Sequence, residues 1–226
     1  MSLLSRSLLL TLLSCFALSL HAQPRESIEG VHYVALPQPV PTDNGAPDKI
    51  EVREVFWYGC KECSTFEPMM TKYRDEGVRG DLVFVRMPAV WNELMSLHAR
   101  IYYTSVELMN EGRITPAAYR AIHEEQNPLR NEDQIKAFFE ANGVAADAFT
   151  AAWNSETVTA AVQQATQRTT DYGIDKLPSM ILNGRYKITH NAKVHDHVEL
   201  NVAINNVIRN LRNERRTDFS RVPQTN

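Results

Sequence analysis

The feature that most constrains the fold of this chain is a pair of cysteines at the junction between an apolar segment and a helical one. Residues 50–58 are rich in apolar side chains, as in a strand at the centre of a sheet, and Gly59 interrupts them. Cys60 and Cys63 follow, and the helical pattern continues to about residue 75. We therefore expect Cys60 at a helix N-terminus, where unpaired N–H groups and the helix dipole stabilise a thiolate by about 0.3–1 kcal/mol.

The spacing of the two cysteines favours reactivity over a structural role. The chain has three cysteines, and Cys15 lies in the N-terminal segment discussed below. A bridge between Cys60 and Cys63 closes a very short loop, which removes little entropy from the unfolded chain. We expect Cys60 to be the sulfur that meets the substrate. Cys63, one turn along the helix and turned inward, is expected to complete or resolve the exchange.

Half of a zinc site is the alternative explanation for the cysteine pair. Structural zinc usually takes two pairs of ligands, and the candidates for a second pair are His195 and His197. Because these histidines are a poor match for a second ligand pair, we predict that the protein holds no metal. We also predict no other cofactor.

Residues 1–22 have the pattern of a secretory signal peptide, which predicts export. Arg6 supplies a positive charge, residues 8–20 supply the apolar stretch, and Ala22 precedes the predicted cleavage. The apolar run is shorter than the roughly 20 residues that a transmembrane helix needs. The alternative is a lipoprotein signal with Cys15 as the lipidated residue, although the apolar run continues beyond Cys15.

Apolar residues recur at helical spacing between Pro88 and Gly173, where strand patterns are missing. Thr115 before Pro116 is a signal for a helix start, and Gly173 is a signal for a helix end. We therefore expect an inserted helical domain. The expected helices span 93–109, 116–125, 132–142, 147–153 and 156–172.

Strand patterns lie on both sides of this helical stretch. Residues 82–87 follow the first helix, so a strand–helix–strand unit with a parallel pair is expected. Residues 179–182 and 185–188 flank Asn183-Gly184, a dipeptide typical of a tight hairpin. The other expected elements are an edge strand at 31–36 and a C-terminal helix at 194–212.

The segment EVFWYGCKEC at 54–63, with Phe66-Glu67, resembles the active-site segment of DsbA-like thiol-disulfide oxidoreductases. Residues 151–155 (AAWNS) and 177–186 (LPSMILNGRY) are similar to the late helical and cis-proline segments of that family. The resemblance implies an α/β protein, a thioredoxin fold with an inserted all-helical domain. The expected division is a signal peptide at 1–22, thioredoxin-like parts at 23–88 and 174–226, and the helical insertion at 89–173.

The resemblance also assigns roles to residues away from the cysteines. Pro178 is the expected cis-proline facing the cysteines, with the backbone of Leu177 free to bind an extended substrate peptide. A trans proline that opens a strand is the alternative. Glu54 falls where the family has a buried acid beneath the active site. We expect Arg86 to pair with it and Glu54 to exchange a proton with Cys63. The alternative is a solvated glutamate at a sheet edge.

The two residues between the cysteines depart from the family. DsbA-type enzymes usually have Pro-His there, and the histidine stabilises the thiolate, whereas this chain has Lys61-Glu62. Lys61 favours a thiolate on Cys60 and Glu62 opposes it. The expected result is a weaker oxidant, because about 1.4 kcal/mol corresponds to roughly 30 mV in a two-electron couple. Lys61 and Glu62 are also expected to contact the substrate.

Aromatic and histidine side chains near the cysteines are expected to be structural. One alternative is that Trp57 and Tyr58 line a substrate-binding surface, but aromatic residues on a central strand more often belong to the core. His98 and His123 lie on expected helices, where core or surface positions are more common than catalytic ones. Trp91 is expected to pack inside the helical insertion.

The predicted function is the introduction of disulfides into exported proteins by a monomeric periplasmic oxidoreductase acting through Cys60 and Cys63. The resemblance implies a DsbB-like, quinone-linked membrane protein that restores the disulfide. The alternatives are a reductase or isomerase that uses the same dithiol, and a non-catalytic thioredoxin-fold protein for binding or for holding zinc. With 24 basic and 27 acidic residues and a net charge of −3, nothing indicates nucleic-acid binding.

Overall fold

The computed structural model describes residues 26–42, 46, 48–77 and 80–221. The predicted signal peptide at 1–22, and Cys15 within it, lie outside the described residues. In the described part, no helix has the length and apolar character needed to cross a membrane. The elements in chain order are β1 (Val34–Ala35), β2 (Ile50–Phe56), α1 (Lys61–Gly77), β3 (Leu82–Pro88), α2 (Glu93–Glu107), α3 (Glu111–His123), α4 (Glu132–Ala141), α5 (Ala146–Trp153), α6 (Glu156–Asp171), β4 (Ser179–Leu182), β5 (Tyr186–Thr189) and α7 (His197–Arg221).

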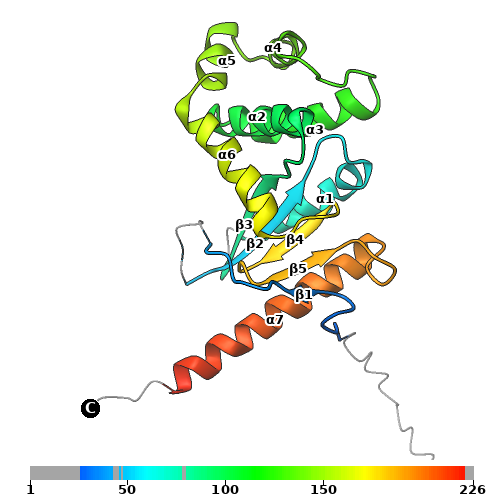
Figure 1. Ribbon diagram of the computed structural model, residues 1–226, viewed down its shortest axis with the longest axis vertical. Coiled ribbons are helices and arrows are strands. Elements are labelled where there is room, and N and C mark those ends of the chain that lie inside the picture. Colours follow the sequence, from blue (N-terminus) through cyan, green and yellow to red (C-terminus); the bar gives the residue numbers. More distant parts are fainter. Residues whose placement is uncertain (1–25, 43–45, 47, 78–79, 222–226) are drawn as a thin grey trace, which may run out of the picture.

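The strands form one mixed sheet in the order β1-β5-β4-β2-β3 (Figure 1). β2 and β3 are parallel, with Ile50 opposite Leu82, which confirms the predicted strand–helix–strand unit. β4 pairs with β2 on its other side in the antiparallel direction. β2 is therefore an interior strand, and every one of its residues is buried. Its C-terminal end leads into the turn that carries the cysteine pair.

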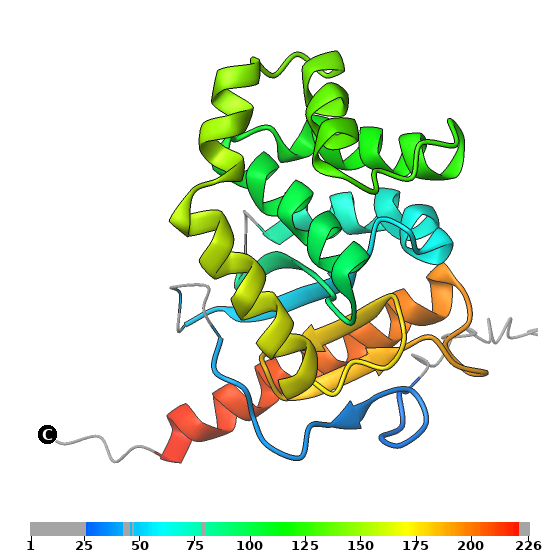
Figure 2. The ribbon, with the colours of Figure 1, turned by 45° about the horizontal axis from the view of Figure 1, so that its top comes forward.

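Helices cover both faces of the sheet (Figures 1 and 2). On one face, Val52 of β2 shares a core with Met70 of α1 and Ile204 of α7. On the other face, Val55 of β2 shares a core with Val162 of α6. Helices α2 to α5 gather at one end of the molecule, away from α7, and α6 runs from them back to the sheet. The architecture is a thioredoxin-like α/β fold with a helical insertion, as predicted.

Two local expectations were wrong. α3 begins at Glu111, so Pro116 lies inside the helix instead of at its start. Pro116 is the sixth residue of α3, so it removes the one helical hydrogen bond that an N–H at this position would donate to the carbonyl of Gly112. Trp91 does not pack inside the helical insertion: it is 48% exposed and its indole N–H donates to the carbonyl of Ile174 at 3.1 Å.

The hairpin between β4 and β5 has the predicted tight turn. Asn183 and Gly184 have φ values of 52° and 62°, as such a turn requires. The segment before β2 crosses directly over this turn, because the N–H of Val40 donates to the carbonyl of Gly184 at 2.8 Å. An added Cβ at Gly184 would lie 1.8 Å from the carbonyl oxygen of Val40. Glycine is therefore required here by close approach as well as by φ.

We expect Gly184→Ala to lower the free energy of unfolding by at least about 2 kcal/mol, because both the backbone conformation and the contact with Val40 must change. Chemical denaturation measures this loss. Gly173→Ala is the matched control, since Gly173 also has a positive φ of 56° but its added Cβ meets nothing closer than the Nζ atom of Lys187 at 3.9 Å. We expect the control to cost about 1 kcal/mol. Equal losses would contradict a role for the Val40 contact.

Candidate active site

Cys60 and Cys63 lie at the N-terminus of α1 and are joined by a disulfide, with their Cα atoms 5.2 Å apart. Cys60 is 9% exposed and Cys63 is 0% exposed, so a substrate approaching from solvent meets Cys60. The backbone N–H of Cys63 donates to the sulfur of Cys60 at 3.1 Å. This contact is the one that a helix N-terminus provides to a thiolate.

The turn between β2 and α1 is held by its own backbone and by Trp57. The N–H of Cys60 donates to the carbonyl of Trp57 at 3.0 Å, and the N–H of Ser64 donates to the carbonyl of Cys60 at 3.2 Å. An added Cβ at Gly59 would lie 2.4 Å from the indole of Trp57. Gly59 therefore lets the indole lie against the backbone just before the first cysteine.

Two histidines of the helical insertion fix this turn from the other side. The indole N–H of Trp57 donates to Nδ1 of His98 at 3.0 Å, and Nε2 of His98 lies 3.2 Å from the carbonyl oxygen of Pro128. Burial lowers the pKa of His98 to about 4, so the ring is neutral and carries its proton on Nε2. Nε2 of His123 lies 2.8 Å from the carbonyl oxygen of Tyr58. The expectation that both histidines are structural fits these contacts.

Tyr58 is fully buried, as expected of an aromatic core residue, and its hydroxyl shares a 3.0 Å hydrogen bond with the hydroxyl of Thr115. Trp57 is only partly buried and packs beside Leu177 against the apolar cluster that contains both cysteines. The Leu177-Pro178 peptide bond is cis, as predicted. The cis-proline loop thus borders the same cluster as the cysteine pair.

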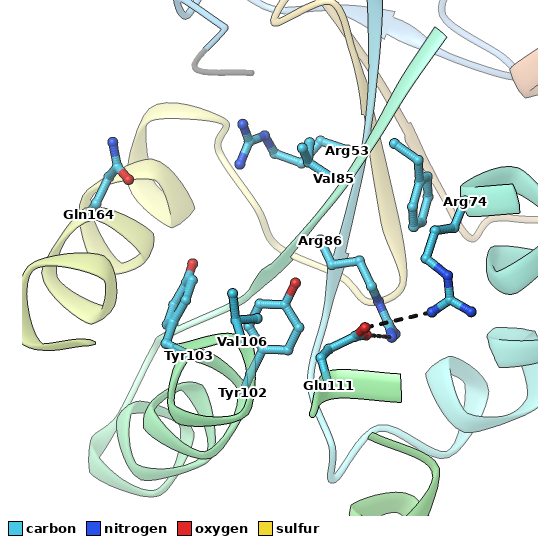
Figure 3. Close-up of a pocket in the computed structure, with 10 residues that line it drawn as sticks. Arg53, Arg74, Val85, Arg86, Tyr102, Tyr103, Val106, Glu111 and Gln164 are labelled. Carbon is cyan, nitrogen blue, oxygen red and sulfur yellow. Dashed lines mark hydrogen bonds and ion pairs between the residues drawn. The ribbon is translucent and has the colours of Figure 1, made fainter. Parts of the chain in front are cut away.

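Glu54 is completely buried, so the alternative of a solvated glutamate is wrong. The predicted pairing is confirmed, because Nε of Arg86 donates to Oε2 of Glu54 at 2.7 Å. The same guanidinium donates to Glu67 of α1 at 2.7 and 3.3 Å and to Glu111 of α3 at 3.2 Å. Figure 3 shows Glu111 between Arg86 and Arg74. The second carboxylate oxygen of Glu111 lies 3.7 Å from the guanidinium of Arg74. We call Glu54, Glu67, Arg86 and Glu111 the Arg86 cluster.

The Arg86 cluster holds three carboxylates against one buried guanidinium. Burial raises the pKa of Glu54 to about 7, and the charges of Glu67 and Glu111 add to that rise, while Arg86 opposes it. Glu54 is therefore able to release or accept a proton near neutral pH. No sequence pattern predicts the role of Glu111, because it comes from a separate helix 25 positions after Arg86, and Glu67 appears in the sequence only within the segment that resembles the family.

Lys61 and Glu62 are both exposed beside the cysteines. Oε2 of Glu62 lies 3.9 Å from the sulfur of Cys60, close enough for its negative charge to disfavour a thiolate there. The ring of His197 contacts Phe66 of α1, with centroids 4.2 Å apart, and His195 meets the carboxylate of Asp196 at 3.7 Å. Within the described ranges, no three His, Cys, Asp or Glu side chains are grouped as a metal site would require.

Comparison with known proteins places this geometry in a family. The family model described as DSBA-like thioredoxin domain matches residues 52–200. The thiol:disulfide interchange protein DsbA of Pseudomonas aeruginosa is 32% identical over 184 residues, covering 80% of this chain and 86% of that protein. The protein of the same name from Azotobacter vinelandii is 33% identical over 177 residues, covering 77% and 81%. The crystal structure of Pseudomonas aeruginosa DsbA matches with a TM-score of 0.78 and 28% identity, covering 84% of this chain and 97% of that one.

We expect Arg86→Met to lower the free energy of unfolding by about 3–5 kcal/mol, because it leaves three carboxylates near the core without their shared cation. Thermal or chemical denaturation at neutral pH measures the loss. The control is Arg120→Met, whose ion pair with Glu125 has side chains 53% and 55% exposed and is expected to contribute no more than about 1 kcal/mol. An Arg86 variant as stable as the Arg120 variant would contradict the importance of the cluster.

Proposed function

This chain belongs to the family of DSBA-like thioredoxin domains, and on that basis we propose that it introduces disulfides into exported proteins through Cys60 and Cys63. The observation that carries the proposal is a disulfide at a helix N-terminus in which Cys60 is the more accessible sulfur. Such a pair accepts two electrons from a substrate dithiol without any cofactor.

The exchange proceeds in two steps. A substrate thiolate attacks the sulfur of Cys60, the bond to Cys63 breaks, and Cys63 leaves as a thiolate that takes up a proton. The second substrate thiolate then attacks the substrate sulfur of the mixed disulfide and releases Cys60 as a thiolate. The substrate loses two electrons and gains a disulfide, and the protein is left as a dithiol.

Glu54 is the proposed proton donor and acceptor for Cys63. Burial places its pKa near neutrality, so the group exists in both forms where the protein works. It lies on β2, the strand that leads directly into the cysteine turn. When Cys63 leaves as a thiolate, a proton from Glu54 neutralises it, and Glu54 recovers a proton from solvent afterwards.

The substrate-binding surface is proposed to include Leu177, Lys61 and Glu62, and the buried Pro178 is proposed to shape the loop that faces the cysteines. Leu177 precedes the cis bond and is partly exposed beside the cluster that contains the cysteines. An extended peptide bound to its backbone would present a cysteine to Cys60. The exposed charges of Lys61 and Glu62, the two residues that follow Cys60, would then lie close to the bound peptide.

The setting of the reaction is also part of the proposal. The relatives are named thiol:disulfide interchange proteins, which act on the cysteines of other proteins. We place the mature protein in the periplasm, after cleavage of residues 1–22, as a monomer whose disulfide is restored by a DsbB-like, quinone-linked membrane protein. We keep 23–88 and 174–226 as its thioredoxin-like parts and 89–173 as the insertion.

A second candidate function is reduction or isomerisation of periplasmic disulfides by the same dithiol. One observation favours it: the carboxylate of Glu62 lies 3.9 Å from the sulfur of Cys60. A thiolate destabilised by that charge makes the disulfide form relatively more stable, and so makes the pair a weaker oxidant. The reduction potential separates the two directions.

To test the exchange, the oxidised protein is mixed with a reduced peptide that has two cysteines, and peptide disulfide is followed by mass spectrometry. We expect one peptide disulfide per protein, and none from Cys60→Ala or Cys63→Ala. Reduced Cys63→Ala should form a lasting mixed disulfide with an added disulfide peptide. Cys60→Ala should do so at least about tenfold more slowly, because Cys63 is buried. Turnover by Cys60→Ala would overturn the assignment.

We expect Glu62→Gln to shift the reduction potential by about 10–30 mV toward a stronger oxidant, because it removes a negative charge beside the Cys60 thiolate. Lys61→Gln is the matched control, and its shift should have the opposite sign. Equilibration with glutathione buffers measures both. A Glu62→Gln protein that is a weaker oxidant than the unaltered chain would contradict this explanation of the Lys61-Glu62 pair.

A further inference from the structure

Two buried polar atoms near the cysteines have no hydrogen-bond partner among the described residues. They are Oε1 of Glu54 and the hydroxyl of Tyr119, on side chains whose residues are 0% and 4% exposed. Buried polar atoms nearly always have a partner, either in the protein or in ordered water. Two such atoms in one region point to a partner that they share.

Contacts around Tyr119 place the two atoms in the same buried region. The ring of Tyr119 has its centroid 5.3 Å from that of Tyr58 and 6.5 Å from that of Phe56. The guanidinium of Arg86 lies 4.5 Å from the centre of the Phe56 ring, and this guanidinium binds Glu54. Burial, followed by the charge of Glu54, raises the pKa of Tyr119 well above its usual range, so its hydroxyl keeps its proton.

The other groups that face Glu54 are already engaged. Arg86 binds Oε2 of Glu54 and not Oε1, and Glu67 and Glu111 are acceptors that bind the same guanidinium. The hydroxyl of Tyr58 is shared with Thr115. Arg74 is paired with Glu111 at 3.7 Å, and Tyr102 of α2 lines the surface hollow beside β3 (Figure 3). The other buried side-chain oxygens without a partner among the described residues are Oγ1 of Thr104 on α2 and the hydroxyl of Tyr119. The charge of Glu54 acts on Tyr119, which makes the Tyr119 hydroxyl the candidate partner for Oε1.

We propose that Tyr119 is a positioning residue for the Glu54 proton, with its hydroxyl and Oε1 of Glu54 joined by one shared buried water molecule. This inference rests on the proposed proton role of Glu54. A water molecule there accepts from the phenol and donates to the carboxylate. When Glu54 is protonated the directions reverse, because a hydroxyl both donates and accepts. The helical insertion, through α3, thus takes part in the proton chemistry beneath the cysteines.

The arrangement favours the ionised form of Glu54. Hydrogen bonds to a charged oxygen are stronger than those to a neutral one, so the water and Tyr119 oppose part of the effect of burial on the pKa of Glu54. Without the hydroxyl, Glu54 would hold its proton to higher pH. Its ability to accept a proton from Cys63 near neutrality would fall.

The test is a titration of the Glu54 side-chain carboxyl by carbon NMR in the oxidised protein, with the signal assigned by Glu54→Gln. The midpoint expected for the unaltered chain is about 7. Tyr119→Phe, which removes one oxygen, should raise the midpoint by about one pH unit. Tyr102→Phe is the matched control and should leave it unchanged. A midpoint in Tyr119→Phe equal to that of the unaltered chain overturns the proposal.

A second measurement needs no substitution and holds even if Tyr119→Phe fails to fold. A high-resolution crystal structure of the unaltered protein should contain one ordered water within about 3 Å of both oxygen atoms. Apolar side chains between the two atoms, with no water, would overturn the proposal. Both readouts are independent of thiol exchange, so they can fail while Cys60 still oxidises substrate, and they can succeed if it does not.

Discussion

The guanidinium of Arg86 is buried and donates to carboxylates from three separate elements: Glu54 on β2, Glu67 on α1 and Glu111 on α3. Removing charges from water is costly, and the three carboxylates share one buried cation, with the more exposed Arg74 meeting Glu111 at 3.7 Å. Burial is the main reason that the pKa of Glu54 lies near 7, and the negative charges of Glu67 and Glu111 add to this rise while Arg86 opposes it. The contact that joins the insertion to the sheet therefore also surrounds Glu54, the carboxyl group proposed to exchange protons with Cys63.

Local patterns were sufficient for much of the fold. The Asn183-Gly184 pair predicted a tight turn because few other residues adopt positive φ at two successive positions, and the structure has 52° and 62° there. The buried β2 and the helix after Cys60 followed from apolar runs and from Gly59. The cis bond at Pro178 came from family resemblance, since the sequence around an isolated proline does not determine its isomer.

Residues that support the site across long sequence separations were not predictable in this way. His123 reaches the carbonyl of Tyr58 from 65 positions away, and Glu111 reaches Arg86 from 25. No period or motif marks such contacts, because they depend on how the insertion docks on the sheet. Tyr119 belongs to the same class: its sequence neighbours indicate a helix face, and its importance appears only with the unpaired oxygen of Glu54.

The two carboxylates proposed to act on the sulfurs lie in different environments. Glu62 is exposed and 3.9 Å from Cys60, so its effect on the thiolate is a through-space repulsion that solvent and salt weaken. Glu54 is shielded from solvent, so burial and the Arg86 cluster decide its protonation. In the proposed exchange, thiolate stability at Cys60 determines the reduction potential, whereas proton supply to Cys63 affects how readily the internal disulfide opens. A substitution between the cysteines is thus able to change the potential without changing the buried proton chemistry.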